Sequence, residues 1–144
     1  PGIKWTEVLQ DPTVELYLVE GEIKAAALAQ HGRPAIGIGG VWNFLTRGEG
    51  DESQPLPDFD LLRMDRPWRL VYDHDAGVKP DLQRAVLRAV GMVKEHGGRP
   101  EVVLIPDLGD GKSGVDDFIA ARLEYKRFLS VLTSEQPAGR IRMV

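Results

Sequence analysis

Hydrophobic and polar positions along the chain fall into short blocks that predict strands separated by helices. Four runs are rich in apolar and β-branched side chains and are bounded by glycine, proline or acidic residues, which is typical of buried strands. These runs are residues 14–19, 34–38, 68–72 and 101–105. The alanine-rich stretch 22–30 follows the first run and predicts a helix that ends before Gly32.

The clearest helical period lies between the third and fourth runs. Apolar side chains recur there at spacings of three and four residues from Leu82 to Val93, and Gly97–Gly98 closes the helix. A last helix is expected from Val115 to about residue 132, and no element is expected after Gln136. Residues 46–67 are rich in glycine, proline and acids, which predicts a long polar loop with a short helix near 59–63. This order predicts an α/β fold with about four parallel strands flanked by helices.

Composition narrows the class of protein. With 144 residues, 42% of them apolar and 28% charged, the chain has the makeup of one globular domain. The absence of cysteine excludes a disulfide scaffold, a thiolate zinc site and a cysteine nucleophile. A net charge of −4 provides no overall basic field for nucleic acid, and no apolar run is long enough to predict a transmembrane helix. We expect a cytoplasmic domain with no membrane contact. Because it opens on Pro1, with no Met and no signal-like segment, we also expect a piece of a longer protein.

Carboxylates fall where two of the predicted strands end. Glu20 follows the first strand, and Asp73 and Asp75 follow the third. In an open parallel sheet the carboxyl ends of the strands line one edge, where ligands bind, so these three acids are expected to converge. Unpaired carboxylates repel one another, and a divalent cation would relieve that repulsion. Hard oxygen ligands favour Mg²⁺ or Mn²⁺ over zinc.

These residues, in this order, resemble the TOPRIM domain of bacterial primases, type IA and type II topoisomerases and OLD-family nucleases. Val19-Glu20-Gly21 matches the glutamate that ends the family's first strand, Gly39-Gly40 its glycine turn, and Asp73-His74-Asp75 its Asp-x-Asp. The likeness covers about residues 14–121 and is greatest to TOPRIM-like domains of plasmid and phage primase-type replication proteins. The resemblance implies a TOPRIM (Rossmann-like) fold and Mg²⁺-dependent phosphoryl transfer on nucleic acid.

Roles for individual residues follow from this resemblance. Asp73 and Asp75 would hold the metal, and Glu20 would act as general acid or base or as a further ligand. Lys24 stands where primases usually carry an acid and topoisomerases a lysine, and would offer charge to a phosphate or be an ordinary surface residue. The family's acidic pair after the fourth strand matches Asp116 and Asp117, so Asp116 is expected near the metal, although a helix N-terminus alone explains acids there.

Other motifs give weaker alternatives. Lys112 lies in a glycine-rich loop after a strand, where it would touch a phosphate cofactor or remain solvated. Residues 106–113 resemble a Walker A loop, but Pro106 stands where its first glycine belongs. Asp73-His74-Asp75 is also similar to the Asp pair of haloacid dehalogenase phosphatases. That pair normally ends the first strand, and the comparison leaves Glu20 without a role.

Three functions remain open for the domain. The first is phosphoryl transfer, as in primer synthesis by a primase-like nucleotidyltransferase of a DNA replication or mobile-element protein. The second is phosphodiester cleavage by a TOPRIM nuclease, and the third is a non-catalytic module that binds nucleic acid or nucleotides. With a net charge of −4, the isolated chain is expected to bind nucleic acid weakly and to have little or no activity alone. The helicase or primase modules of a full-length protein would be its partners.

Overall fold

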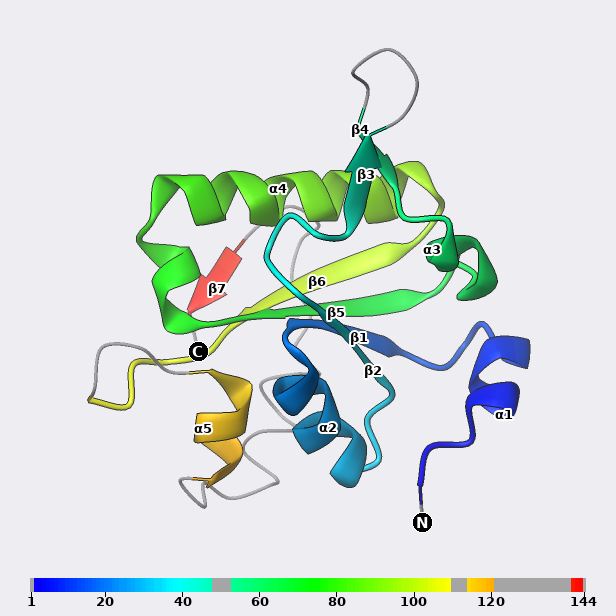
Figure 1. Cartoon of the computed structure of the whole chain (residues 1–144), viewed down its shortest axis with the longest axis horizontal. Coiled ribbons are helices and arrows are strands. Elements are labelled where there is room, and N and C mark those ends of the chain that lie inside the picture. The colour runs from blue at the N-terminus through cyan, green and yellow to red at the C-terminus, as the bar shows by residue number, and fades with distance from the viewer. Residues whose placement is uncertain (1, 48–52, 110–113, 121–140, 144) are drawn as a thin grey trace.

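A parallel β-sheet with helices on both faces forms the centre of the protein, in a computed structural model of the whole chain (Figure 1). The structure describes residues 2–47, 53–109, 114–120 and 141–143. The sheet has five strands in the order β2-β1-β5-β6-β7, and every neighbouring pair is parallel. The strands are β1 (Leu16–Glu20), β2 (Ala35–Ile38), β5 (Pro67–Tyr72), β6 (Arg99–Leu104) and β7 (Ile141–Met143).

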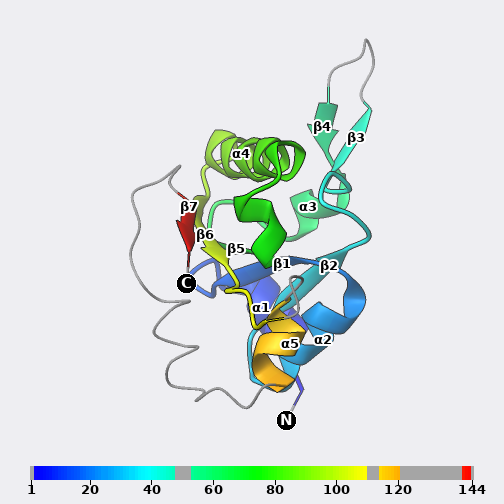
Figure 2. The same ribbon diagram turned by 90° about the vertical axis from the view of Figure 1, so that its left-hand side faces the viewer.

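Helices cover the two faces of this sheet separately, as the edge-on view shows (Figure 2). On one face lies α4 (Pro80–Glu95), which is preceded by the 3₁₀ helix η2 (His74–Gly77). On the other face lie α2 (Glu22–Gln30) and α5 (Val115–Ala120), which contact each other. The short helices α1 (Trp5–Gln10) and α3 (Asp58–Leu61) flank the amino-terminal ends of the strands (Figure 1).

Alternating side chains of the strands divide the core into two layers. The buried side chains of Leu16, Leu18 and Leu70 pack toward α4. Those of Tyr17 and Val19 are buried in the opposite layer, where they pack with Leu28 of α2 and Phe118 of α5. This follows from the two-residue period of a strand, which sends neighbouring side chains to opposite faces. Strands buried on both faces explain the continuous apolar runs in the sequence.

The prediction of an α/β fold with a parallel sheet between helices is confirmed, and α2 has the bounds expected for it. Three details differ. The sheet has a fifth strand, β7, because a three-residue strand is too short to leave a period in the sequence. Residues 46–67 are not a simple loop, because β3 (Leu45–Arg47) and β4 (Ser53–Pro55) pair as an antiparallel two-stranded sheet before α3. Helix α1 was not predicted. The helix expected over 115–132 is described only as far as Ala120.

Arg66, directly before β5, is a fully buried charged residue that joins the amino-terminal segment to the sheet. Its guanidinium donates hydrogen bonds to the carbonyl oxygens of Arg63 and Val8, both at 2.9 Å. Longer contacts run to the carbonyls of Val14 at 3.4 Å and Leu9 at 3.5 Å. Four carbonyl acceptors account for the burial of this cation, since an unpaired buried charge would be strongly destabilising.

Candidate functional site

The order of the strands creates a crevice at the carboxyl ends of β1 and β5. The chain leaves β1 toward β2 on one side, and it leaves β5 toward β6 on the other. Such a switch point is where open α/β sheets bind ligands. The register pairs Val19 with Val71, so Glu20 ends β1 beside Tyr72, and Asp73 follows one residue later. Figure 1 shows that η2 and the first turn of α4 follow β5 directly at this edge.

A cleft of about 620 Å³ opens at this switch point. The acids that line it are Glu20, Asp73, Asp75 and Asp81, the basic residues are Lys24 and Lys79, and the others are Val41, Pro80 and Leu82. The structure thus places Glu20, Asp73 and Asp75 around one cleft, and their role as metal ligands stays a prediction. The volume lies within the range of small-molecule sites.

The shape of the chain around Glu20 depends on two glycines. Gly21 ends the strand with a φ of 100°, a left-handed conformation that suits glycine, and it begins α2 as its N-cap. Gly37 of β2 lies so close that a Cβ atom there would be 2.8 Å from the carbonyl oxygen of Gly21. This close approach of β2 to the start of α2 fixes where Glu20 and Lys24 stand at the edge of the sheet.

Asp73 and Lys24 form an ion pair across the sheet edge. The ammonium of Lys24 lies 2.7 Å from Oδ2 of Asp73, and their side chains are only 19% and 14% exposed. Burial raises the pKa of the Asp73 carboxyl, and the negative charges of Asp75 and Asp116 raise it further, while Lys24 opposes the shift. Asp73 therefore lies near two other carboxylates, and the ammonium of Lys24 stabilises its ionised form.

Asp75 has a lysine partner of its own. It lies in η2, where the ammonium of Lys79 is 2.9 Å from its Oδ2 atom. The side chain of Asp75 is 19% exposed and that of Lys79 is 62% exposed. Sequence analysis did not single out Lys79. The signal was its position four residues after Asp75, a spacing that brings side chains together in a helical turn.

Asp116 reaches the same group of side chains from α5. A Cβ atom on Gly114 would lie 2.7 Å from Oδ1 of Asp116, 3.0 Å from Oδ1 of Asp73 and 2.6 Å from Cε of Lys24. All three atoms thus surround one glycine, which was not recognised from the sequence. Oδ1 of Asp116 is buried without a hydrogen-bond partner. Asp116 thus lies near Asp73, and its expected place near a metal stays a prediction; Lys112 lies outside the described residues.

The donor chemistry of the cleft suits a hard divalent cation, because the side-chain atoms that could bind one are carboxylate oxygens. Within the described ranges, however, no three Asp, Glu or His side chains are already arranged to hold a metal ion. One oxygen of Asp73 and one of Asp75 each contact an ammonium group. The carboxylates that would hold such an ion are Glu20, Asp73 and Asp75, with Asp116 close to Asp73.

The aromatic residues after the glycine turn have separate environments. Phe44 is fully buried in the core, so it presents no surface for a ligand to stack on. Trp42 remains 44% exposed, next to Val41 in the wall of the cleft.

None of the helices in the described part of the chain combines the length and apolar character that a membrane crossing needs.

Comparison with protein-family models matches residues 4–125 to a family described as "Domain of unknown function (DUF3854)". Among curated proteins, the chain is similar to an uncharacterized protein of Picosynechococcus sp., with 32% identity over 126 residues. That match covers 80% of this chain but only 12% of the relative's length. No solved structure matches the chain.

Proposed function

The chain belongs to the DUF3854 family, and from its own site we propose that it is a TOPRIM-like domain that carries out Mg²⁺- or Mn²⁺-dependent phosphoryl transfer on nucleic acid. One observation carries the proposal: Glu20, Asp73 and Asp75 line one cleft at the switch point of a parallel sheet. Because the match spans 12% of the relative's length, we propose that the domain works within a longer primase-type replication protein.

In this proposal each side chain has a distinct task. Asp73 and Asp75 would hold the divalent ion, which supplies Lewis-acid stabilisation of charge on the phosphoryl oxygens. Glu20 also lines the cleft, and among the described residues its carboxylate forms no salt bridge, unlike those of Asp73, Asp75 and Asp81. It would take or give a proton at the attacking or leaving oxygen. Lys24 would keep Asp73 ionised and hold a fixed positive charge in the cleft.

A titration of the protein with Mn²⁺, in which the heat of binding is measured by calorimetry, tests the metal site. We expect saturable binding that Asp73→Ala weakens by at least about tenfold, since even residues that only support metal ligands change affinity by that much. Asp65→Ala is the matched control, because Asp65 is exposed and lies just before the other end of β5. Equal affinities of the wild type and the Asp73 variant would refute the site.

The metal-free protein gives a second test. Asp75 adds to the negative charge around Asp73, so Asp75→Asn should leave the melting temperature unchanged or raise it. The ion pair with Lys79 that is lost contributes little to stability, because the Lys79 side chain is 62% exposed. A fall of several degrees without metal would instead assign Asp75 a structural role.

A non-catalytic nucleic-acid- or nucleotide-binding module is the second candidate. The net charge of −4 and the pairing of both cleft lysines with acids leave little free positive charge to grip a polymer, which favours binding of a nucleotide over catalysis on a nucleic acid. Primer synthesis and nicking assays with Mn²⁺, with Glu20→Gln as control, separate the candidates. Turnover that this substitution abolishes supports catalysis, and cleavage without synthesis identifies a nuclease. Metal binding without turnover supports the binding module.

A further inference from the structure

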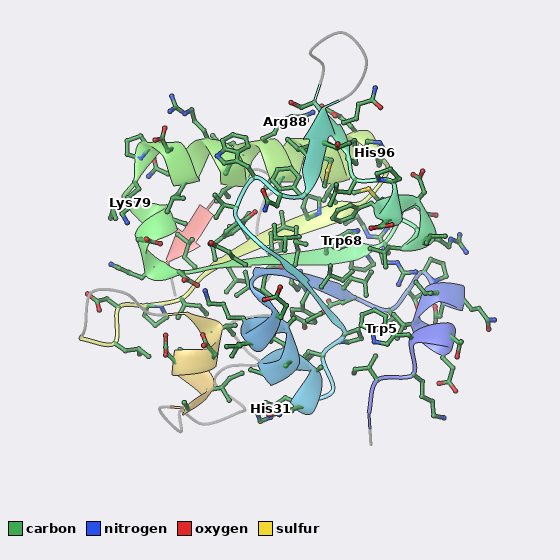
Figure 3. All side chains as sticks on the ribbon, viewed as in Figure 1. Trp5, His31, Trp68, Lys79, Arg88 and His96 are labelled. Carbon is green, nitrogen blue, oxygen red and sulfur yellow. The ribbon has the colours of Figure 1, made fainter. Side chains whose placement is uncertain are left out.

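Lys79 occupies a position in the cleft that the proposed metal chemistry does not use. It is the residue directly before α4, and its side chain helps to line the cleft. Figure 3 labels it at the start of that helix, beside η2. Its ammonium contacts Oδ2 of Asp75 at 2.9 Å. The amine therefore lies against an oxygen that a divalent cation would need.

The two lysines of the cleft are held very differently. Lys24 is 19% exposed and pairs with Asp73, a residue from another element of the fold, so its charge is fixed by the packing around it. Lys79 is 62% exposed and pairs with a carboxylate only four residues earlier. Pairs of this kind are weak, because water competes for the exposed ammonium and the long lysine side chain loses freedom. Lys79 can therefore leave Asp75 at little cost, whereas Lys24 cannot leave Asp73 so easily.

Once displaced, the Lys79 ammonium still belongs to the wall of the cleft. The first residues of α4 line the same wall, and the amino-terminal end of this 16-residue helix carries partial positive charge. A displaced ammonium beside a cation-loaded carboxylate cluster suits an anionic oxygen. The tetrahedral anion expected in this cleft is a phosphate group.

We propose that Lys79 exchanges partners: it neutralises Asp75 while the metal is absent, and it binds a phosphate oxygen of the substrate when a divalent cation occupies Asp75. This inference rests on the proposed function, because it needs the cation at Asp73 and Asp75. It makes Lys79 a phosphate-binding residue and links the order of binding, with metal first and phosphate second.

Binding measurements on the whole chain test the exchange without any activity assay. Removal of the competing ammonium in Lys79→Met should tighten binding of Mn²⁺ alone by about two- to fivefold, in keeping with a weak exposed pair. The same variant should bind inorganic pyrophosphate to the Mn²⁺-loaded protein about tenfold more weakly, because a charged hydrogen bond is lost. Lys79→Arg keeps the charge and should stay close to the wild type in both measurements. Lys94→Met, an exposed lysine at the far end of the same helix, is the matched control.

The outcomes separate this inference from the proposed function. If the wild type does not bind Mn²⁺, the proposed function fails. If the wild type binds Mn²⁺ and Asp73→Ala does not, while Lys79→Met matches Lys94→Met in both measurements, only the exchange is overturned. A Lys79→Met variant that binds Mn²⁺ more weakly than the wild type would also overturn it, because a competitor's removal cannot lower affinity.

Discussion

Gly37 of β2 lies very close to the backbone at the start of α2, so Gly37→Ala tests whether this approach positions the residues of the cleft. Gly37 lies in the middle of β2, and its register partner on β1 is Val19. A Cβ atom there would lie 2.8 Å from the carbonyl oxygen of Gly21, 3.0 Å from its carbonyl carbon and 3.1 Å from Cα of Glu22. All three are backbone atoms, so no side-chain rotation can relieve the overlap. The start of α2 has to move away from β2 instead.

The size of the effect follows from the cost of overpacking. Forcing one methyl group into a packed contact costs about 1–3 kcal/mol when the backbone has to shift. In a chain of this size, that loss lowers the melting temperature by roughly 3–10 °C. The same shift moves Glu20 and Lys24, which lie on either side of Gly21. We therefore expect weaker Mn²⁺ binding together with the lower melting temperature.

Thermal unfolding by circular dichroism measures this change, with Gly39→Ala as the matched control. Gly39 lies two residues later, and the nearest atom to an added Cβ there is Nδ2 of Asn43 at 3.5 Å, an ordinary contact distance. Gly37→Ala should unfold well below Gly39→Ala. Equal melting temperatures of the two variants would refute the claim that the approach of β2 to α2 is tight.

Two further predictions concern stability away from the cleft. Gly91 lies inside α4, and an added Cβ would meet only Oε1 of Glu95 at 4.0 Å, so Gly91→Ala should raise the free energy of unfolding by about 0.5–1 kcal/mol; a lower melting temperature would contradict this. Burial raises the pKa of the Tyr17 hydroxyl to about 12, above its ordinary value of about 10. The unfolded tyrosine therefore ionises first as the pH rises, so its contribution to stability is complete below about pH 10 and is lost toward pH 12. Urea titrations across this range should show a steeper loss for the wild type than for Tyr17→Phe, and parallel curves would contradict the assignment.

The sheet and its main helices were predictable because their buried positions form apolar runs or recur at regular spacings in the sequence. Leu82 to Val93 repeat at helical spacing because one side of α4 packs on the sheet. The elements that were missed are short or depend on distant partners. Helix α1 has only six residues, and the fixed position of its last turn depends on contacts with Arg66, 58 positions after Val8. No local pattern can encode such a contact.

The site was predictable in its acids and not in its pairings. Because Glu20, Asp73 and Asp75 follow strands, parallel topology alone brings them to one edge. The sequence does not specify that Lys24 contacts Asp73, since these residues are 49 positions apart. Gly114 was missed for a similar reason. Its importance comes from three side chains of other segments and of α5 that surround it, and none of them is visible at the glycine itself.

The buried guanidinium of Arg66 decides where this domain can be shortened. It donates hydrogen bonds to the carbonyl oxygens of Val8 and Leu9, in the last turn of α1. A truncated protein that starts at residue 14 would keep the cation and lose these acceptors, which leaves a charge in a partly dehydrated gap. The apolar side chain of Val8 would be lost from the core as well. Helix α1 is thus an integral part of the folding unit, and a minimal expressible domain has to include it or replace Arg66 at the same time.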